Sequence, residues 1–130
     1  MLLDTHIVVR WLAAPKKSTR DQMRVLRDAT RRQELLAISA ITLLEIAVLF
    51  GRATGSNEAD AEAVLEQIES GSVFQIIPFT MDIAAAVAAV GRALGDPADR
   101  AIVSTARVHR LKLVTSEKRI IASGLVPVVG

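Results

Sequence analysis

Four acidic residues stand where a carboxylate could bind a metal ion. They are Asp4 in "MLLD", Glu45 in "AITLLEIAVLF", Asp99 in "DPAD" and Glu117 after "LKLVT". Carboxylates that converge on one pocket repel one another, and a divalent cation removes that repulsion. Hard oxygen donors in a chain with no cysteine and only two histidines favour Mg²⁺ or Mn²⁺ over zinc. The acids therefore predict a magnesium or manganese site if the fold brings them together.

Glu45 is the hardest of the four to explain without a ligand. It interrupts an almost wholly apolar helical segment, and no lysine or arginine occurs between residues 38 and 50. Burial of an ionised carboxylate without a partner costs several kcal/mol. Thr42, one turn earlier, shares its helix face. A cation held jointly with other acids would satisfy Glu45, and the competing explanation is a buried ion pair with a distant lysine or arginine.

The other three acids have simpler structural explanations. Asp4 could cap the helix that follows it, and Glu117 lies in a first helical turn, where the helix dipole favours an acid. In "DPAD", Asp96 is expected as the N-cap and Asp99 as the acid three residues later, much as in a capping box. The sequence leaves both explanations open for these three residues.

An alternation of strands and helices must position the acids. Apolar runs predict five short strands, near residues 1–4, 35–39, 73–78, 111–115 and 125–129. Helices are predicted near residues 5–13, 18–33, 40–50, 56–70, 81–94, 97–110 and 116–123, with Ser18, Ser39, Ser56 and Thr80 as N-caps. This order predicts an α/β fold, a three-layer α/β/α domain with a mostly parallel sheet. Ligands of such sheets bind beyond the carboxyl ends of the strands, where Asp4 and Glu117 fall.

Composition narrows the class of protein. The 130 residues predict a single domain, residues 1–130, large enough for its own core. Aromatic residues make up 3%, which argues against nucleic-acid binding by stacking on aromatic platforms. There is no cysteine, no basic leader and no apolar run of about 18 residues, so we expect a cytoplasmic protein with no membrane partner.

The charge is unevenly distributed although its net value is only +2. Residues 15–34 hold seven lysines and arginines, and residues 56–70 hold five acids and no base. On the predicted helix 18–33, four arginines fall on one stripe: Arg20, Arg24, Arg27 and Arg31. The stripe could follow an RNA backbone or receive an acidic segment of a partner protein, and the simpler explanation is a solvated helix face.

Four segments of the chain follow the pattern of a known family. They are "LLDTHIVVRWL", "SAITLLEIA", "DPADRAIVSTA" and "LKLVTSEKRI". In this order, and across essentially the whole chain, they resemble the PIN-domain family and, within it, the VapC-type toxins of toxin–antitoxin pairs. The resemblance maps the four acidic positions of that family onto Asp4, Glu45, Asp99 and Glu117. The fourth position is usually an aspartate, so Glu117 departs from the family by one methylene group.

The resemblance implies a Mg²⁺- or Mn²⁺-dependent endoribonuclease that cuts structured RNA, often transfer RNA, and is held inactive by a cognate antitoxin. It also implies a homodimer, for which the apolar helices 40–50 and 81–94 are candidates. In this interpretation Asp4, Asp99 and Glu117 hold the cation, and Glu45 acts through water or as a base. Other side chains could orient the carboxylates or contact phosphate: Thr5, Asp96, Arg100, Thr115 and Ser116.

Other classes of protein are less consistent with these residues. A PIN-like scaffold that only binds RNA or protein would be expected to lack one or more acids, and all four positions are filled here. A phosphotransferase of the haloacid-dehalogenase kind needs a second aspartate two residues after the first, where this chain has His6. A DNA-directed nuclease stays possible, because metal-dependent hydrolysis is similar for both backbones. His6 and His109 are expected to be surface or packing residues.

Overall fold

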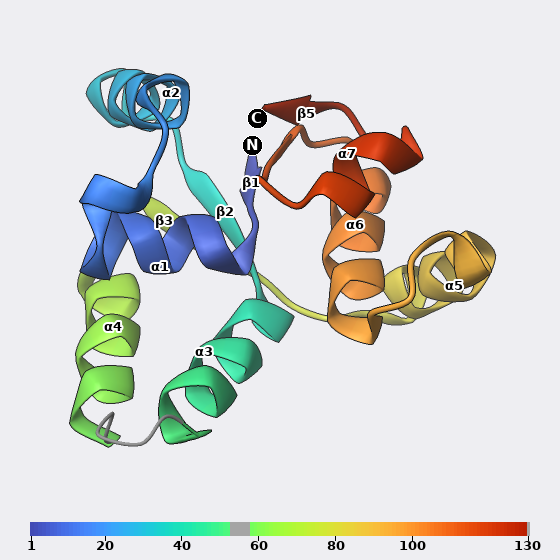
Figure 1. The fold of residues 1–130 in the computed structure, drawn as a ribbon, viewed down its shortest axis with the longest axis horizontal. Helices are drawn as coiled ribbons and strands as arrows, with labels where there is room; N and C mark the ends of the chain where they lie inside the picture. The colour runs from blue at the N-terminus through green and yellow to red at the C-terminus, as the bar shows by residue number, and fades with distance from the viewer. Residues whose placement is uncertain (53–57, 130) are drawn as a thin grey trace.

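Short strands and helices alternate along the chain, in a computed structural model that describes residues 1–52 and 58–129 (Figure 1). The strands are β1 (Leu2–Leu3), β2 (Leu36–Ser39), β3 (Phe74–Ile77), β4 (Leu113–Val114) and β5 (Val128–Val129). The α-helices are α1 (Thr5–Ala13), α2 (Arg20–Arg31), α3 (Ala40–Arg52), α4 (Glu58–Ser70), α5 (Met81–Val90), α6 (Pro97–His109) and α7 (Lys118–Ser123). Two 3₁₀ turns, η1 (Pro15–Lys17) and η2 (Gly91–Ala93), follow α1 and α5.

The five strands form one parallel sheet in the order β3-β2-β1-β4-β5. Strand β1 lies in the centre, with Leu2 opposite Ala37 of β2 on one side and Leu113 of β4 on the other. Parallel neighbours require long crossover connections, and helices supply them here. The predicted α/β fold with a mostly parallel sheet of about five strands is confirmed.

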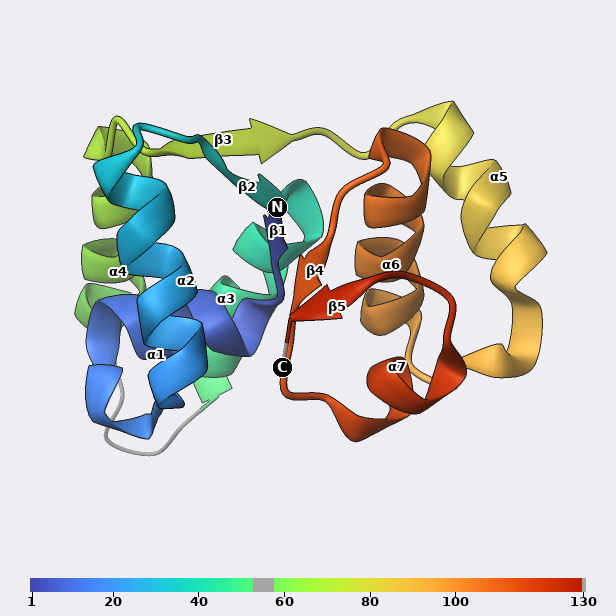
Figure 2. The same ribbon diagram turned by 90° about the horizontal axis from the view of Figure 1, so that it is seen from above.

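Helices cover both faces of the sheet, because successive strand residues point to opposite sides. Leu2 and Leu113 join the apolar cluster beneath α5, α6 and α7. Leu3 and Val114 join the second cluster, beneath α1, α2, α3 and α4. Figures 1 and 2 show these two groups of helices on either side of the strands. The three predicted layers are therefore present, and the strand ends meet between them.

The start of α2 differs from the prediction, because Thr19 rather than Ser18 is its N-cap. The Thr19 hydroxyl accepts from the backbone N–H of Gln22 at 3.1 Å, and the Gln22 side chain accepts from the N–H of Thr19 at 3.3 Å. This reciprocal arrangement needs a glutamine or glutamate three residues after the cap. A cap at Ser18 would place Asp21 there, so the register that begins at Thr19 is favoured.

The helix predicted over 81–94 ends early, at Val90. Gly91 takes a φ of 58°, which glycine adopts more readily than other residues and which stops the helix. Leu94 is consequently extended, although it remains buried in the core. The cap predicted at Ser56 and the turn around it lie outside the described residues. Among the described helices, none combines the length and the apolar character needed to cross a membrane.

Candidate active site

Asp4 occupies the carboxyl end of the central strand and is almost completely buried. Its Oδ1 accepts a hydrogen bond from the N–H of Thr5 at 2.8 Å, so it caps α1 as the simpler explanation predicted. Its Oδ2 accepts from the Thr115 hydroxyl at 2.7 Å. Two elements far apart in the sequence therefore fix this carboxylate, and both oxygens keep lone pairs for a further ligand.

Thr115 connects two of the predicted metal ligands. It is buried directly after β4, donates to Asp4, and accepts from the backbone N–H of Glu117 at 3.0 Å. Glu117 in turn caps α7, where its Oε1 accepts from the N–H of Arg119 at 3.4 Å. The hydroxyl of Thr115 thus sets the position of the β4–α7 connection relative to Asp4.

Glu45 is half-buried on α3 and is held by a threonine hydroxyl rather than by a base. The Thr5 hydroxyl donates to its Oε1 at 2.5 Å. The hydroxyl oxygens of Thr5 and Thr42 lie 3.0 Å apart. Because the single hydroxyl proton of Thr5 goes to the carboxylate, Thr42 must donate to Thr5. No lysine or arginine of the described residues forms an ion pair with Glu45, so they do not supply the buried ion pair that the sequence left open.

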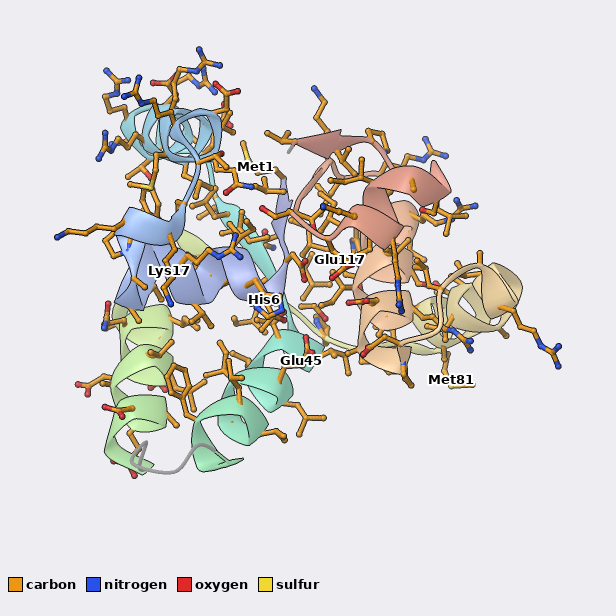
Figure 3. The ribbon with its side chains drawn as sticks, in the orientation of Figure 1. Met1, His6, Lys17, Glu45, Met81 and Glu117 are labelled. Atoms are coloured by element: carbon orange, nitrogen blue, oxygen red, sulfur yellow. The ribbon has the colours of Figure 1, made fainter. Side chains whose placement is uncertain are left out.

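Asp99 shows most directly that the carboxylates are close to one another. Burial is the main reason that its pKa rises from the ordinary 3.8 to about 6. Neighbouring negative charges raise this pKa further, in decreasing order Asp96, Asp4, Glu117 and Glu45. In Figure 3 the side chains of Glu45 and Glu117 lie around the carboxyl end of β1. The fold therefore assembles the predicted acids from four separate elements at one edge of the sheet.

The donor chemistry of this group fits a hard divalent cation. Each of the four side chains offers carboxylate oxygens, and their mutual repulsion is the kind that such a cation relieves. Within residues 1–52 and 58–129, however, no three acidic or histidine side chains lie close enough together to hold a metal ion as they stand. Mg²⁺ keeps several of its waters and is bound through one or two protein carboxylates, so it needs fewer ligands than these four residues offer.

Three of the residues predicted to support the site form their side-chain contacts elsewhere. Asp96 is exposed and caps α6 by accepting from the N–H of Asp99 at 3.0 Å. The guanidinium of Arg100 donates through Nε to the carbonyl oxygen of Leu94, so it fixes the loop before α6. The Ser116 hydroxyl accepts from the side chain of Gln22. In the described part of the chain, none of the three forms a hydrogen bond or an ion pair with Asp4 or Glu45.

The arginine stripe of α2 lies on the outer surface, and its four members are exposed. Two of them pair with acids on the same helix, Arg24 with Asp21 and Arg31 with Asp28. The stripe lines a shallow depression of about 550 Å³ beside η1. Exposed pairs of this kind contribute little to stability, so the stripe is available to a charged partner.

Sequence reasoning missed two side chains at this site, Arg10 and Gln22. Arg10 Nη1 lies 3.3 Å from the Ser116 hydroxyl oxygen, and the fully buried Gln22 donates to the same oxygen at 2.7 Å. A capping-box signature, threonine followed three residues later by glutamine, could have identified Gln22. Arg10 lies one turn after His6, which places both on the same face of α1.

The chain is similar to known proteins over most of its length. The family model described as "PIN domain" matches residues 1–123. The chain belongs to the PIN-domain family. This PIN-domain chain is 29% identical over 121 residues to Ribonuclease VapC22 of Mycobacterium tuberculosis, an alignment that covers 92% of this chain and 88% of that protein.

Solved structures share the fold of this PIN domain. A toxin–antitoxin complex from Klebsiella pneumoniae superposes with a TM-score of 0.70 at 26% identity, over 99% of this chain and 95% of that chain. VapBC2 from Rickettsia felis, solved bound to a DNA fragment from its promoter, gives a TM-score of 0.77 at 17% identity, over 98% and 96% of the two chains. The second likeness concerns the fold alone.

Proposed function

We propose that this protein is an endoribonuclease that depends on Mg²⁺ or Mn²⁺ and acts as the toxin of a toxin–antitoxin pair. The observation that carries the proposal is the gathering of Asp4, Glu45 and Glu117 around Asp99 at the carboxyl edge of the sheet. Their charges add to burial and to the charge of Asp96 in raising the pKa of Asp99. Membership of the PIN-domain family and the likeness to a ribonuclease support it. A cytoplasmic location follows from a substrate such as transfer RNA.

Asp4, Asp99 and Glu117 are the proposed cation ligands. When bound there, a divalent cation would neutralise these carboxylates and polarise the phosphate that is cut. Asp4 is already oriented by the N–H of Thr5 and the hydroxyl of Thr115, so its carboxylate needs little reorganisation. Glu117 is the longest of the three, and its backbone is positioned by Thr115.

Glu45 is the proposed general base. Its Oε1 accepts a hydrogen bond from the Thr5 hydroxyl, which leaves Oε2 free to accept a proton from an attacking water. Thr42 donates to Thr5 and thereby fixes the direction of the Thr5 hydroxyl. Thr5 and Thr42 are positioning residues in this scheme. Asp96 acts on the site through its charge and through the start of α6 rather than by contact with a cation.

The partner that inactivates the enzyme is proposed to be a cognate antitoxin that covers the arginine stripe of α2. The similar chain from Klebsiella pneumoniae was solved in a toxin–antitoxin complex. Double reversal of charge, Arg24→Glu with Arg27→Glu, should weaken capture of the co-expressed antitoxin and leave RNA cleavage intact. Intact capture with slower, less salt-dependent cleavage would instead assign the stripe to RNA, to which Arg100 is also a candidate contact.

A homodimer is proposed through the apolar outer faces of α3 and α5. Leu44 is 61% exposed, Val48 47% and Met81 86%, which is unusual for side chains of this size. A two-fold interface is the commonest way to bury such a surface.

The experiment that tests the main proposal is RNA cleavage by the purified protein. We expect EDTA to abolish cleavage and Mg²⁺ or Mn²⁺ to restore it. Asp4→Asn and Asp99→Asn should each be inactive yet folded, whereas the control Asp82→Asn, at an exposed first-turn position of α5, should keep full activity. Undiminished cleavage by both site variants would exclude the assignment and favour a scaffold role.

A further inference from the structure

A small pocket beside the acids has one acidic and one cationic wall. Its volume is about 180 Å³, and its lining residues are Asp4, His6, Arg10, Ser116 and Glu117. His6 and Arg10 come from α1, and Ser116 lies at the start of the β4–α7 connection. Figure 3 shows His6 near the carboxyl end of β1, on the α1 side. The pocket is therefore shared between two of the proposed cation ligands, Asp4 and Glu117, and two basic residues of α1.

The hydroxyl proton of Ser116 is free to point into this pocket. The amide orientation of Gln22 is fixed, because its oxygen accepts from the N–H of Thr19 in the capping box. Its nitrogen therefore donates to Ser116 Oγ, at 2.7 Å. Arg10 donates to the same oxygen at 3.3 Å. Two donors occupy the lone pairs of Ser116, and its side chain is exposed where it lines the pocket, so its own proton is available to an acceptor that enters.

Arg10 is a cation without an acidic partner, although two acids line the same pocket. In the part of the chain that the structure describes, it forms no ion pair, and its one side-chain hydrogen bond goes to Ser116. The guanidinium carries five N–H donors, so most of them remain unused. His6, one turn earlier on the same face of α1, adds further donor capacity.

An anion with several oxygens would satisfy all of these donors together. Guanidinium groups bind phosphate in a two-pronged geometry that a single carboxylate oxygen or a water does not reproduce. The volume of the pocket is below the roughly 300 Å³ at which small-molecule sites begin, so it admits a phosphate group rather than a whole nucleotide. The neighbouring acids disfavour a free phosphate dianion and favour the singly charged phosphodiester of a longer chain.

We propose that Arg10, Ser116 and His6 form a subsite that holds a phosphate of the RNA backbone next to the one that is cut. The inference rests on the proposed ribonuclease function and adds residues to it. The subsite places one backbone phosphate on the cationic wall while the acids and their cation act on its neighbour. Gln22 is a positioning residue for this subsite, because it reaches no part of the pocket itself and only fixes Ser116.

The test measures RNA binding separately from cleavage. A fluorescein-labelled single-stranded oligoribonucleotide is titrated, in Mg²⁺, into Asp99→Asn protein with and without Arg10→Gln. We expect Arg10→Gln to weaken binding about tenfold, the loss of one charge-assisted contact. The slope of log affinity against log salt concentration should fall by about 0.7, as for one phosphate contact on a single strand. The matched control Arg92→Gln, exposed on η2 and absent from the pocket, should change neither value.

Ser116 provides a second, independent arm. Ser116→Ala should weaken binding to a similar degree, and Ser116→Thr, which keeps the hydroxyl, should restore it. Melting temperatures identify any variant that merely unfolds. Arg10→Lys then serves as the folded alternative, because it keeps the positive charge but loses the two-pronged guanidinium.

The possible outcomes separate the two proposals. If the wild type cleaves RNA and Arg10→Gln binds it with unchanged affinity and slope, the subsite is refuted and the ribonuclease stands. If no variant binds or cleaves RNA, both proposals fail. If Arg10→Gln leaves RNA binding unchanged and weakens capture of the antitoxin, the pocket is a protein-binding site and the subsite is again refuted.

Discussion

Replacement of Asp99 by asparagine should stabilise the metal-free protein, although it removes a proposed cation ligand. The pKa of Asp99 in the folded chain is raised from 3.8 to about 6. Between these values the folded state binds the proton more tightly than the unfolded state, so stability falls as the pH rises from about 4 to about 6. Above this pH window the loss of stability due to Asp99 is complete. Asparagine carries no charge, so the variant avoids the loss.

The expected gain can be worked out from this pKa. A rise from 3.8 to about 6 corresponds to about 3 kcal/mol, at about 1.36 kcal/mol for each tenfold change in proton affinity. Asp99 is only half-buried, so screening by water and salt leaves about 1.5 kcal/mol. The lost attraction between an acid and the start of α6 subtracts roughly 0.5 kcal/mol. The net gain of about 1 kcal/mol raises the melting temperature by roughly 3–5 °C.

Thermal denaturation followed by circular dichroism in EDTA measures this gain. Asp99→Asn should melt above the wild type at pH 8 and level with it or below it at pH 4. Asp82→Asn is the matched control, because Asp82 also lies in the first turn of a helix, α5, but is exposed, and it should show no gain at either pH. Added Mg²⁺ should raise the melting temperature of the wild type more than that of Asp99→Asn. A gain that is absent at pH 8, or equal at both pH values, would refute the reasoning.

Three further outcomes follow from the hydrogen bonds and exposed surfaces. Thr5→Val removes the hydrogen bond to Glu45 and leaves Thr42 without its partner, so urea denaturation should show that the free energy of unfolding falls by about 1–3 kcal/mol. Its kcat should fall more than its KM changes, whereas Thr5→Ser should behave as wild type. Thr115→Val should weaken Mg²⁺ binding about 10- to 100-fold by calorimetry, and an unchanged affinity would remove Thr115 from the site. Leu44→Glu with Val48→Glu should give a folded monomer by light scattering, whereas a persistent dimer would place the interface elsewhere.

The order of strands and helices could be predicted from the sequence because it depends on local signals. Apolar runs marked the strands, and caps such as Thr80 and Asp96 marked the helix starts. The errors arose where a side chain decides between neighbouring registers. Gln22 selects Thr19 over Ser18 as the cap of α2, and the conformation of Gly91 ends α5 before its apolar pattern ends.

The acids of the site could be predicted from the sequence, but the side chains that hold them in place could not. The carboxylates lie at recognisable positions after strands or inside an apolar helix. Thr5 is hydrogen-bonded to Thr42 and Glu45, which lie 37 and 40 positions away in the sequence. Ser116 is hydrogen-bonded to Gln22, 94 positions away. Periodic patterns in the sequence do not predict such contacts, since the contacts depend on how α1, α2 and α3 pack against the strand ends.

The hydrogen bond between Thr115 and Asp4 joins residues 111 positions apart, and it has a consequence for synthesis of the protein. Strand β1 leaves the ribosome early, but β4, its neighbour in the sheet, is translated only after α6. Until then the nascent chain carries Asp4 and Glu45 without β4 and Thr115, because contacts so distant in sequence form late. Translation thus includes an interval in which the chain exists but is inactive. Under the proposed function, a chain that ends between residues 100 and 112 should be inert, even though three of the four acids would already be present.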